Sequence, residues 1–213
     1  MRVNEGLFIE FSHGLHTIIW PSLYVDKLRS EKKVLHTLIK TLHVVDWVTE
    51  KLSHVAAVAV TAATFISAGN AFVRYGFDIT SNGWLEIQWY LFAATVMLGG
   101  PYVLKVNEHV RVDIFYGKLK GFGPAYIDLF GLIFFLLPVC GLMVYLTWPF
   151  FLNMYHSGEM SSNAGGLIRW PAMLLLPVGF SLMFIQGLAE AIKRLLYING
   201  VIKLDILYAK PLQ

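Results

Sequence analysis

The chain has 213 residues, of which 56% are hydrophobic and only 15% are charged, and its formal net charge is +3. Soluble domains carry about 25% charged residues, so this composition disfavours a soluble domain and predicts a protein with several membrane spans. The small net charge excludes polyanion binding by the whole chain, and a single cysteine, Cys140, excludes an intrachain disulfide framework and a cysteine-based zinc or iron–sulfur site.

Residues 1–53 form an N-terminal arm that the sequence predicts to be amphipathic and not membrane-spanning. Two histidines, Glu10 and Pro21 interrupt its first apolar run, and no clear signal-peptide core or cleavage site is present, so we expect the arm to be retained. Over 34–53 apolar residues recur at i, i+3, i+4 and i+7, which predicts a helix with one apolar stripe. Such a helix either lies along the cytoplasmic membrane surface or packs on another subunit or on its own protein.

Four apolar segments follow, each long enough to cross the roughly 30 Å hydrocarbon core of a bilayer. The spans are expected at 54–73, 84–104, 125–148 and 171–192, with connections at 74–83, 105–124 and 149–170 and a tail at 193–213. The first span is rich in small residues, which favour close contact between helices in lipid. The predicted fold class is therefore an all-α integral membrane protein, with four transmembrane helices and an amphipathic interfacial arm helix.

The positions of lysine and arginine orient these spans. Every Lys and Arg except Arg74 and Arg169 falls in the arm, in the 105–124 loop or in the tail, which share one side of the membrane. By the positive-inside rule that side is the cytoplasm, so both termini are expected to be cytoplasmic.

Polar groups inside the spans are costly in lipid and are therefore candidates for function. Glu86 and Gln88 lie about one turn inside the outer end of the second span. They either bind a partner helix or a polar solute, or they are simply hydrated at the interface. Asp128 and Glu190 lie near the inner ends of the third and fourth spans, where solvated end charges are expected.

The loop after the second span carries another polar motif. His109, Arg111 and Asp113 alternate with valines, so they share one face if the loop is extended, whereas His109 and Asp113 meet at i, i+4 if it is helical. Without a second His or a Cys the set is weak evidence for a metal or acid–base site. A salt-bridged loop that positions two helices is favoured.

Several of these residues together resemble a known family. The run of Glu86-Ile-Gln88, Leu91-Phe92, Gly99-Gly100 and Glu108-His109-Val110-Arg111-Val112-Asp113 is similar to the signature of the DctQ-like small permease subunits of tripartite ATP-independent periplasmic (TRAP) transporters. The resemblance covers roughly residues 50–195 and leaves most of the arm outside it.

The resemblance implies a small, non-enzymatic inner-membrane subunit of a sodium-coupled, binding-protein-dependent secondary transporter for organic acids. Its implied partners are a large multi-span permease that carries substrate and sodium, and a soluble periplasmic binding protein. No cofactor is implied for this chain, because sodium coupling is expected in the large subunit. The site residues it implies fall into two groups: Glu86, Gln88, His109, Arg111 and Asp113 as a subunit-interface or structural motif, and Arg74 and Arg169 as part of a docking surface for the binding protein.

Two other classes of protein stay open on the residues alone. One is the membrane-anchor subunit of an oxidoreductase, although none of the seven histidines lies in the middle of a span, where a haem held by paired histidines would need them. The other is a small integral-membrane enzyme acting on lipids, with the loop from His109 to Asp113 as its site.

Overall fold

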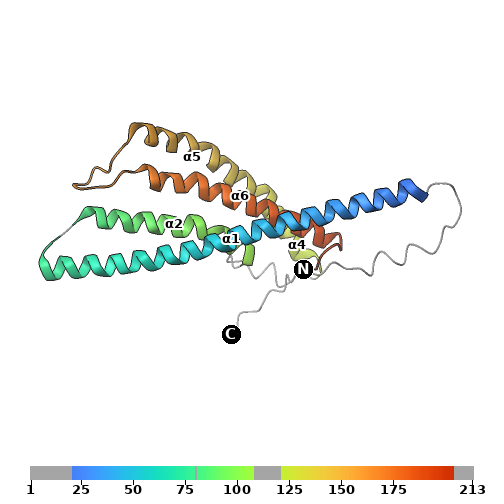
Figure 1. Cartoon of the computed structure of the whole chain (residues 1–213), viewed down its shortest axis with the longest axis horizontal. Helices are drawn as coiled ribbons and strands as arrows, with labels where there is room; N and C mark the ends of the chain where they lie inside the picture. Colours follow the sequence, from blue (N-terminus) through green and yellow to red (C-terminus); the bar gives the residue numbers. More distant parts are fainter. Residues whose placement is uncertain (1–20, 80, 108–120, 204–213) are drawn as a thin grey trace.

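The computed structural model describes residues 21–79, 81–107 and 121–203, with side chains from residue 32 onward. In these ranges the chain is almost entirely helical (Figure 1), apart from connections and one isolated bridge between Met160 and Ile168. The elements are α1 (Pro21–Phe77), α2 (Asn82–Val106), α4 (Gly123–Gly131), the π-helical stretch η3 (Leu132–Leu136), α5 (Leu137–Ser157) and α6 (Trp170–Ile198). Within the described ranges four helical runs are long and apolar enough to cross a membrane: Lys32–Phe77, Asn82–Val106, Gly123–Ser157 and Trp170–Ile198. The expected all-α membrane protein is confirmed.

α6 lies at the centre of the arrangement, because it contacts α1, α2, α4, η3 and α5. α1 packs along α2, and α5 packs along α6, so the chain forms two helical hairpins. The connections of the two hairpins, 78–81 and 158–169, lie at one end of the bundle, which we call the loop end (Figure 1). The opposite end, where α1 begins and α6 ends, is called the terminal end.

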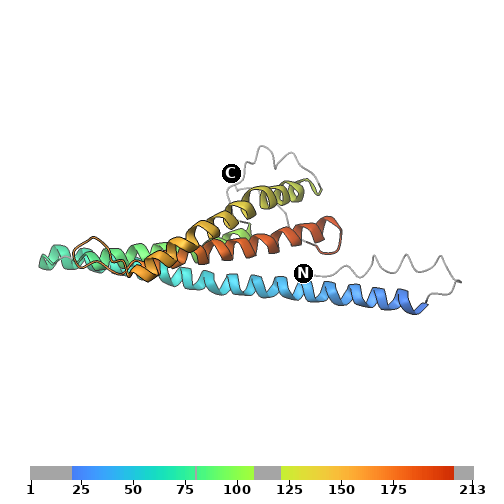
Figure 2. The same cartoon turned by 90° about the horizontal axis from the view of Figure 1, so that it is seen from above.

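α1 is one helix of 57 residues, about 85 Å long, and it extends beyond the other helices at the terminal end (Figure 2). Between Ser22 and Ala68 the sequence has no glycine or proline, so no residue weakens or breaks the backbone hydrogen-bond ladder. The structure thus has one continuous helix where the sequence predicts an arm helix followed by a first span, with no break near residue 53.

The apolar stripe predicted over 34–53 is present, and it faces this same protein. Leu42, on the stripe, is only 4% exposed. Val44 and Trp47, which lie off the stripe, are exposed. At Leu42 the stripe packs on its own protein, which is one of the three settings considered for it.

Small residues let the helices approach one another closely. Ala56 is buried on α1, and a Cβ atom added at Gly99 of α2 would lie 3.5 Å from the Cβ of Ala56. On the other side of α2, a Cβ atom at Gly179 of α6 would lie 2.6 Å from the Cβ of Met97. The contact between α2 and α6 therefore requires glycine at 179, as expected for helices that associate in lipid through small residues.

The third membrane segment is longer than the expected span at 125–148. α4, η3 and α5 form one helical run that ends at Ser157, and Pro149 lies inside it. A proline is tolerated there because neighbouring groups in a helical bundle can satisfy the backbone positions that it frees. The connection between α5 and α6 therefore comprises residues 158–169, which is shorter than the expected 149–170. The fourth span also continues past its expected end, to Ile198.

Candidate functional site: two buried polar clusters

At the loop end, the carboxylate of Glu86 on α2 holds the connection between α5 and α6. Glu86 is 3% exposed and accepts hydrogen bonds from the backbone N–H of Leu167 (2.6 Å), from the side-chain amide of Asn163 (2.8 Å) and from the hydroxyl of Ser161. We call these four residues the loop clasp. The protein's own donors therefore bind both carboxylate oxygens of Glu86, which also lines a pocket of about 240 Å³ together with Trp89 and Arg169.

Two more hydrogen bonds fix the same connection on α2. Asn82 donates from its side-chain amide to the carbonyl oxygen of Ala164 at 3.1 Å, and Tyr90 donates its hydroxyl to the carbonyl oxygen of Ile168 at 3.0 Å. The connection from 158 to 169 therefore has a defined position at the loop end, although it lacks regular secondary structure.

Gln88 lies two residues after Glu86 but points to different neighbours. Thr95 and Gly99, seven and eleven residues further along α2, both contact Ala56 of α1, which places Gln88 on the α1-facing side of α2. Gln88 is 7% exposed, and its amide nitrogen has no hydrogen-bond partner among the described residues. A buried donor without a partner lowers stability, because the water that it lost is not replaced.

At the terminal end, buried polar and charged side chains from three helices meet. We call this group the ionic cluster. Its members are Asp46 and Thr49 of α1, Asp128 of α4, and Gln186, Glu190, Lys193 and Arg194 of α6. Lys193 and Arg194 are 5% and 6% exposed, so both cations are held almost entirely out of solvent.

The two cations bridge the carboxylates of different helices. Lys193 Nζ lies 2.6 and 2.8 Å from the two carboxylate oxygens of Asp46 and 2.7 Å from Glu190 Oε1. Arg194 pairs with the other oxygen of Glu190 and donates from Nε to Asp128 at 3.3 Å. Buried ions are tolerated only when they are paired and hydrogen-bonded, and removing one partner leaves a costly unpaired charge. The cluster therefore links α1, α6 and α4.

Gln186 completes the cluster and is fully buried, with 0% exposure. Its carbonyl oxygen accepts a hydrogen bond from the Thr49 hydroxyl at 2.8 Å. Its amide nitrogen donates to Asp46 and to Glu190, each at 3.1 Å. Both ends of this side chain are thus used to join α1 to α6.

α2 is tied to the same end by Lys105. Lys105 Nζ donates to the backbone carbonyl oxygen of Asp46 at 3.1 Å and pairs with Glu50 at 3.0 Å. All four membrane-spanning runs are therefore connected through polar contacts near the terminal end.

The expectation of solvated end charges at Asp128 and Glu190 is wrong, since their side chains are 8% and 5% exposed. The sequence reasoning also missed Gln186, Lys193 and Arg194. A signal was present, because polar residues at 186, 190 and 193–194 recur every three or four positions and so share one face of an otherwise apolar helix.

The remaining predicted site residues are not brought together. Arg74 lies in the last turn of α1 and is exposed. Arg169 immediately precedes α6 and pairs with Glu159 within its own connection. His109, Arg111 and Asp113 lie outside the described residues. Across the part of the chain that is described, no group of three or more His, Cys, Asp or Glu side chains could hold a metal ion.

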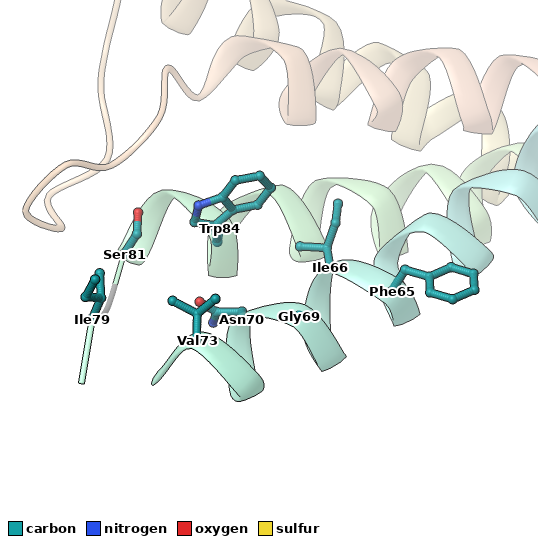
Figure 3. Close-up of a pocket in the computed structure, with 8 residues that line it drawn as sticks. All are labelled: Phe65, Ile66, Gly69, Asn70, Val73, Ile79, Ser81 and Trp84. Atoms are coloured by element: carbon teal, nitrogen blue, oxygen red, sulfur yellow. The ribbon is translucent and has the colours of Figure 1, made fainter. Parts of the chain in front are cut away.

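An apolar pocket of about 440 Å³ lies between α1 and α2 near the loop end (Figure 3). It is lined by Phe65, Ile66, Gly69, Asn70, Val73, Ile79, Ser81 and Trp84. None of these lining residues is ionisable, so the pocket suits an apolar group and offers no acid, base or metal ligand.

Comparison with known proteins identifies the family. The chain matches the DctQ component of the tripartite ATP-independent periplasmic transporters over residues 63–196, which is more than half of its length. The chain belongs to this family. The chain is 30% identical over 106 residues to a protein of Haemophilus influenzae, which is named provisionally as a TRAP transporter small permease protein. That alignment covers 49% of this chain and 65% of the relative, so the chain spans slightly less than two thirds of the relative's length.

The DctQ match includes the whole loop clasp and the α6 part of the ionic cluster. Asp46 and Thr49 precede it, since it begins at residue 63. The ionic cluster therefore joins the region matched to the DctQ component, residues 63–196, to the part of α1 that precedes it. As a DctQ family member, the protein is a multi-pass inner-membrane transporter component.

Proposed function

We propose that this chain is the small permease subunit of a sodium-coupled, binding-protein-dependent TRAP transporter for organic acids. In this role it is a scaffold for a large elevator-type permease subunit, which carries the substrate and the sodium ions, and it contributes to the surface on which the periplasmic binding protein docks. The observation that carries the proposal is the DctQ family match over residues 63–196.

The scaffold role is supported by the way in which the helices are fastened. A scaffold has to keep its shape while its partner moves. The ionic cluster and Lys105 connect all four spanning runs at the terminal end, and the loop clasp fixes the last connection at the loop end. Large apolar side chains such as Phe92, Phe134 and Tyr145 remain exposed and are available to lipid or to helices of the large subunit.

The docking role is supported by the loop end. We place this end in the periplasm, because Arg74 and Arg169 are the two basic residues on that side and all others fall in segments on the opposite side. The connection 158–169 is held by the loop clasp and presents Met160, which is 60% exposed. A connection with a fixed position loses little conformational freedom when a partner binds.

The proposal is tested by uptake into proteoliposomes that contain the large permease subunit with or without this chain. Binding protein loaded with an organic acid is supplied outside, with an inward sodium gradient. Uptake is expected only when this chain and the sodium gradient are both present. Equal uptake without this chain would overturn the proposed role.

A variant in the same assay tests the docking contribution. Glu86→Ala removes the acceptor that fixes the 158–169 connection, so we expect the binding-protein concentration needed for half-maximal uptake to rise about tenfold. Lys40→Ala, which removes an exposed charge of α1 outside both polar clusters, is the control and should change this concentration less than about twofold.

A further inference from the structure

The apolar pocket between α1 and α2 extends along the helices from the loop end toward the middle of the membrane (Figure 3). At the loop end it is lined by Ile79 and Ser81 of the connection between the two helices. At its other end it is lined by Phe65, which lies about 18 Å from the end of α1 at Phe77 along the helix axis. The hydrocarbon core of a bilayer is about 30 Å thick, so the pocket covers the depth of about one leaflet.

The two ends of the pocket differ in polarity. In the half nearer the loop end, Figure 3 shows the hydroxyl oxygen of Ser81, the indole nitrogen of Trp84 and the side-chain amide of Asn70. Phe65 and Ile66 line the opposite end. Since the loop end joins two spans, it lies at a membrane surface. The hydrogen-bonding groups of the pocket are therefore near the headgroups, and its aromatic and aliphatic end is in the hydrocarbon core.

These polar groups have no hydrogen-bond partner within the described ranges. Ser81 is the N-cap residue of α2, where a serine hydroxyl commonly binds the backbone of the first helical turn, but its side chain makes no such bond. The side chains of Asn70 and Trp84 also make no hydrogen bond to another described residue. Asn70 lies about 10 Å from the end of α1, at the edge of the hydrocarbon core, where an unbonded amide costs free energy. Its amide therefore favours a partner from outside the chain.

The lining residues select the chemistry of that partner. No ionisable side chain lines the pocket, so nothing there would pair with a phosphate or with the carboxylate of a free fatty acid. An amide, a hydroxyl and an indole N–H are neutral donors, which suit a carbonyl oxygen. The volume of about 440 Å³ lies within the ~300–1,000 Å³ of typical ligand sites. A neutral carbonyl at the outer end of an apolar chain is the chemistry of an acyl ester.

A transmembrane helix of a partner protein fits these features less well. Such a helix crosses the whole hydrocarbon core, whereas the pocket ends near the middle of the membrane at Phe65. The backbone groups of a helix are already bonded to one another, so they would leave the Asn70 amide without a partner. Both features favour a single acyl chain.

We propose that this pocket binds one acyl chain of a glycerolipid from the surrounding bilayer, with the ester carbonyl at the Asn70 amide and the chain extending toward Phe65. Ser81 and Trp84 supply further donors at the same end. Gly69 leaves room for the chain, since a Cβ atom added there would meet no other atom within 4 Å. The site shares no residue with the loop clasp or the ionic cluster, and it does not depend on the proposed transport function.

The first test asks whether the pocket recognises the ester. The full-length chain, purified from its native membrane in mild detergent, is mixed with equal amounts of two phosphatidylethanolamines that differ only in ester or ether linkage, and bound lipids are counted by native mass spectrometry. The unaltered chain should retain the ester form about fivefold better, because only an ester offers a carbonyl. Asn70→Leu should abolish this preference. Ser67→Leu, at an exposed polar position of α1 outside the pocket, is the matched control and should keep it.

The second test fills the pocket. Gly69→Leu should lower retention of the ester lipid at least about fivefold, because the new side chain occupies the space of the acyl chain. Gly76→Leu is the matched control, since this glycine also lies on α1 with open space around it but does not line the pocket. Leucine forms helices more readily than glycine, so both variants should fold.

Several outcomes would overturn the proposal. They are equal retention of the ester and ether lipids, an ester preference that survives Asn70→Leu, and equal retention in Gly69→Leu and Gly76→Leu. Loss of a co-purifying large subunit in Gly69→Leu, without loss of lipid, would assign the pocket to a partner helix instead.

Discussion

Two buried glutamines in the spans differ in whether their side-chain amides are hydrogen-bonded. Gln186 binds Thr49, Asp46 and Glu190 through both ends of its amide. Gln88 has an amide nitrogen with no partner in the described part of the chain. Burying an amide costs free energy unless it is bonded, so these two side chains contribute to stability in opposite directions.

Replacing each glutamine by leucine tests this difference. Gln186→Leu should lower the free energy of unfolding by about 1–2 kcal/mol, because the Thr49 hydroxyl and two buried carboxylates lose a partner. Gln88→Leu should be neutral or stabilising, since it removes an unbonded donor. Thermal unfolding of both variants in the same detergent measures the contrast, and equal losses would contradict the role given to Gln186.

Among the elements, α1 differs most from what the sequence pattern predicts. The periodicity over 34–53 correctly indicates an apolar stripe, but a stripe does not say whether a helix stops or continues. The absence of glycine and proline from Ser22 to Ala68 was the informative feature, because without them the backbone has no reason to bend at the membrane boundary. Of the stripe, Leu42 is buried against its own protein, and Leu38 and Val45 are half-buried.

A distance measurement tests the continuity of α1. Spin labels at Lys40→Cys and Ala68→Cys, in a Cys140→Ser background, are separated by 28 residues and should lie about 42 Å apart by double electron–electron resonance. A sharp bend near residue 53 would shorten this distance to about 30 Å. Labels at Val55→Cys and Ala68→Cys, both on the same side of residue 53, form the control pair, expected at about 20 Å in either geometry.

For the whole molecule, the four spans are predictable from the sequence. A chain that crosses lipid must form its backbone hydrogen bonds within helices, and long apolar runs in the sequence indicate such helices. The site is predictable only in part. Glu86 stands out as a charge inside a span, but its partners Ser161, Asn163 and Leu167 lie in a connection without periodicity. The ionic cluster depends on α1 reaching α6, a contact between residues about 140 positions apart that no local pattern encodes.

The central claim is that this DctQ family member is a rigid subunit that works bound to a large permease. Purification of the tagged chain from its native membrane in mild detergent, with identification of the co-eluting proteins, tests it most directly. The account predicts a roughly stoichiometric, much larger multi-span membrane protein. A chain that elutes alone and stable, with no large membrane partner, would contradict it.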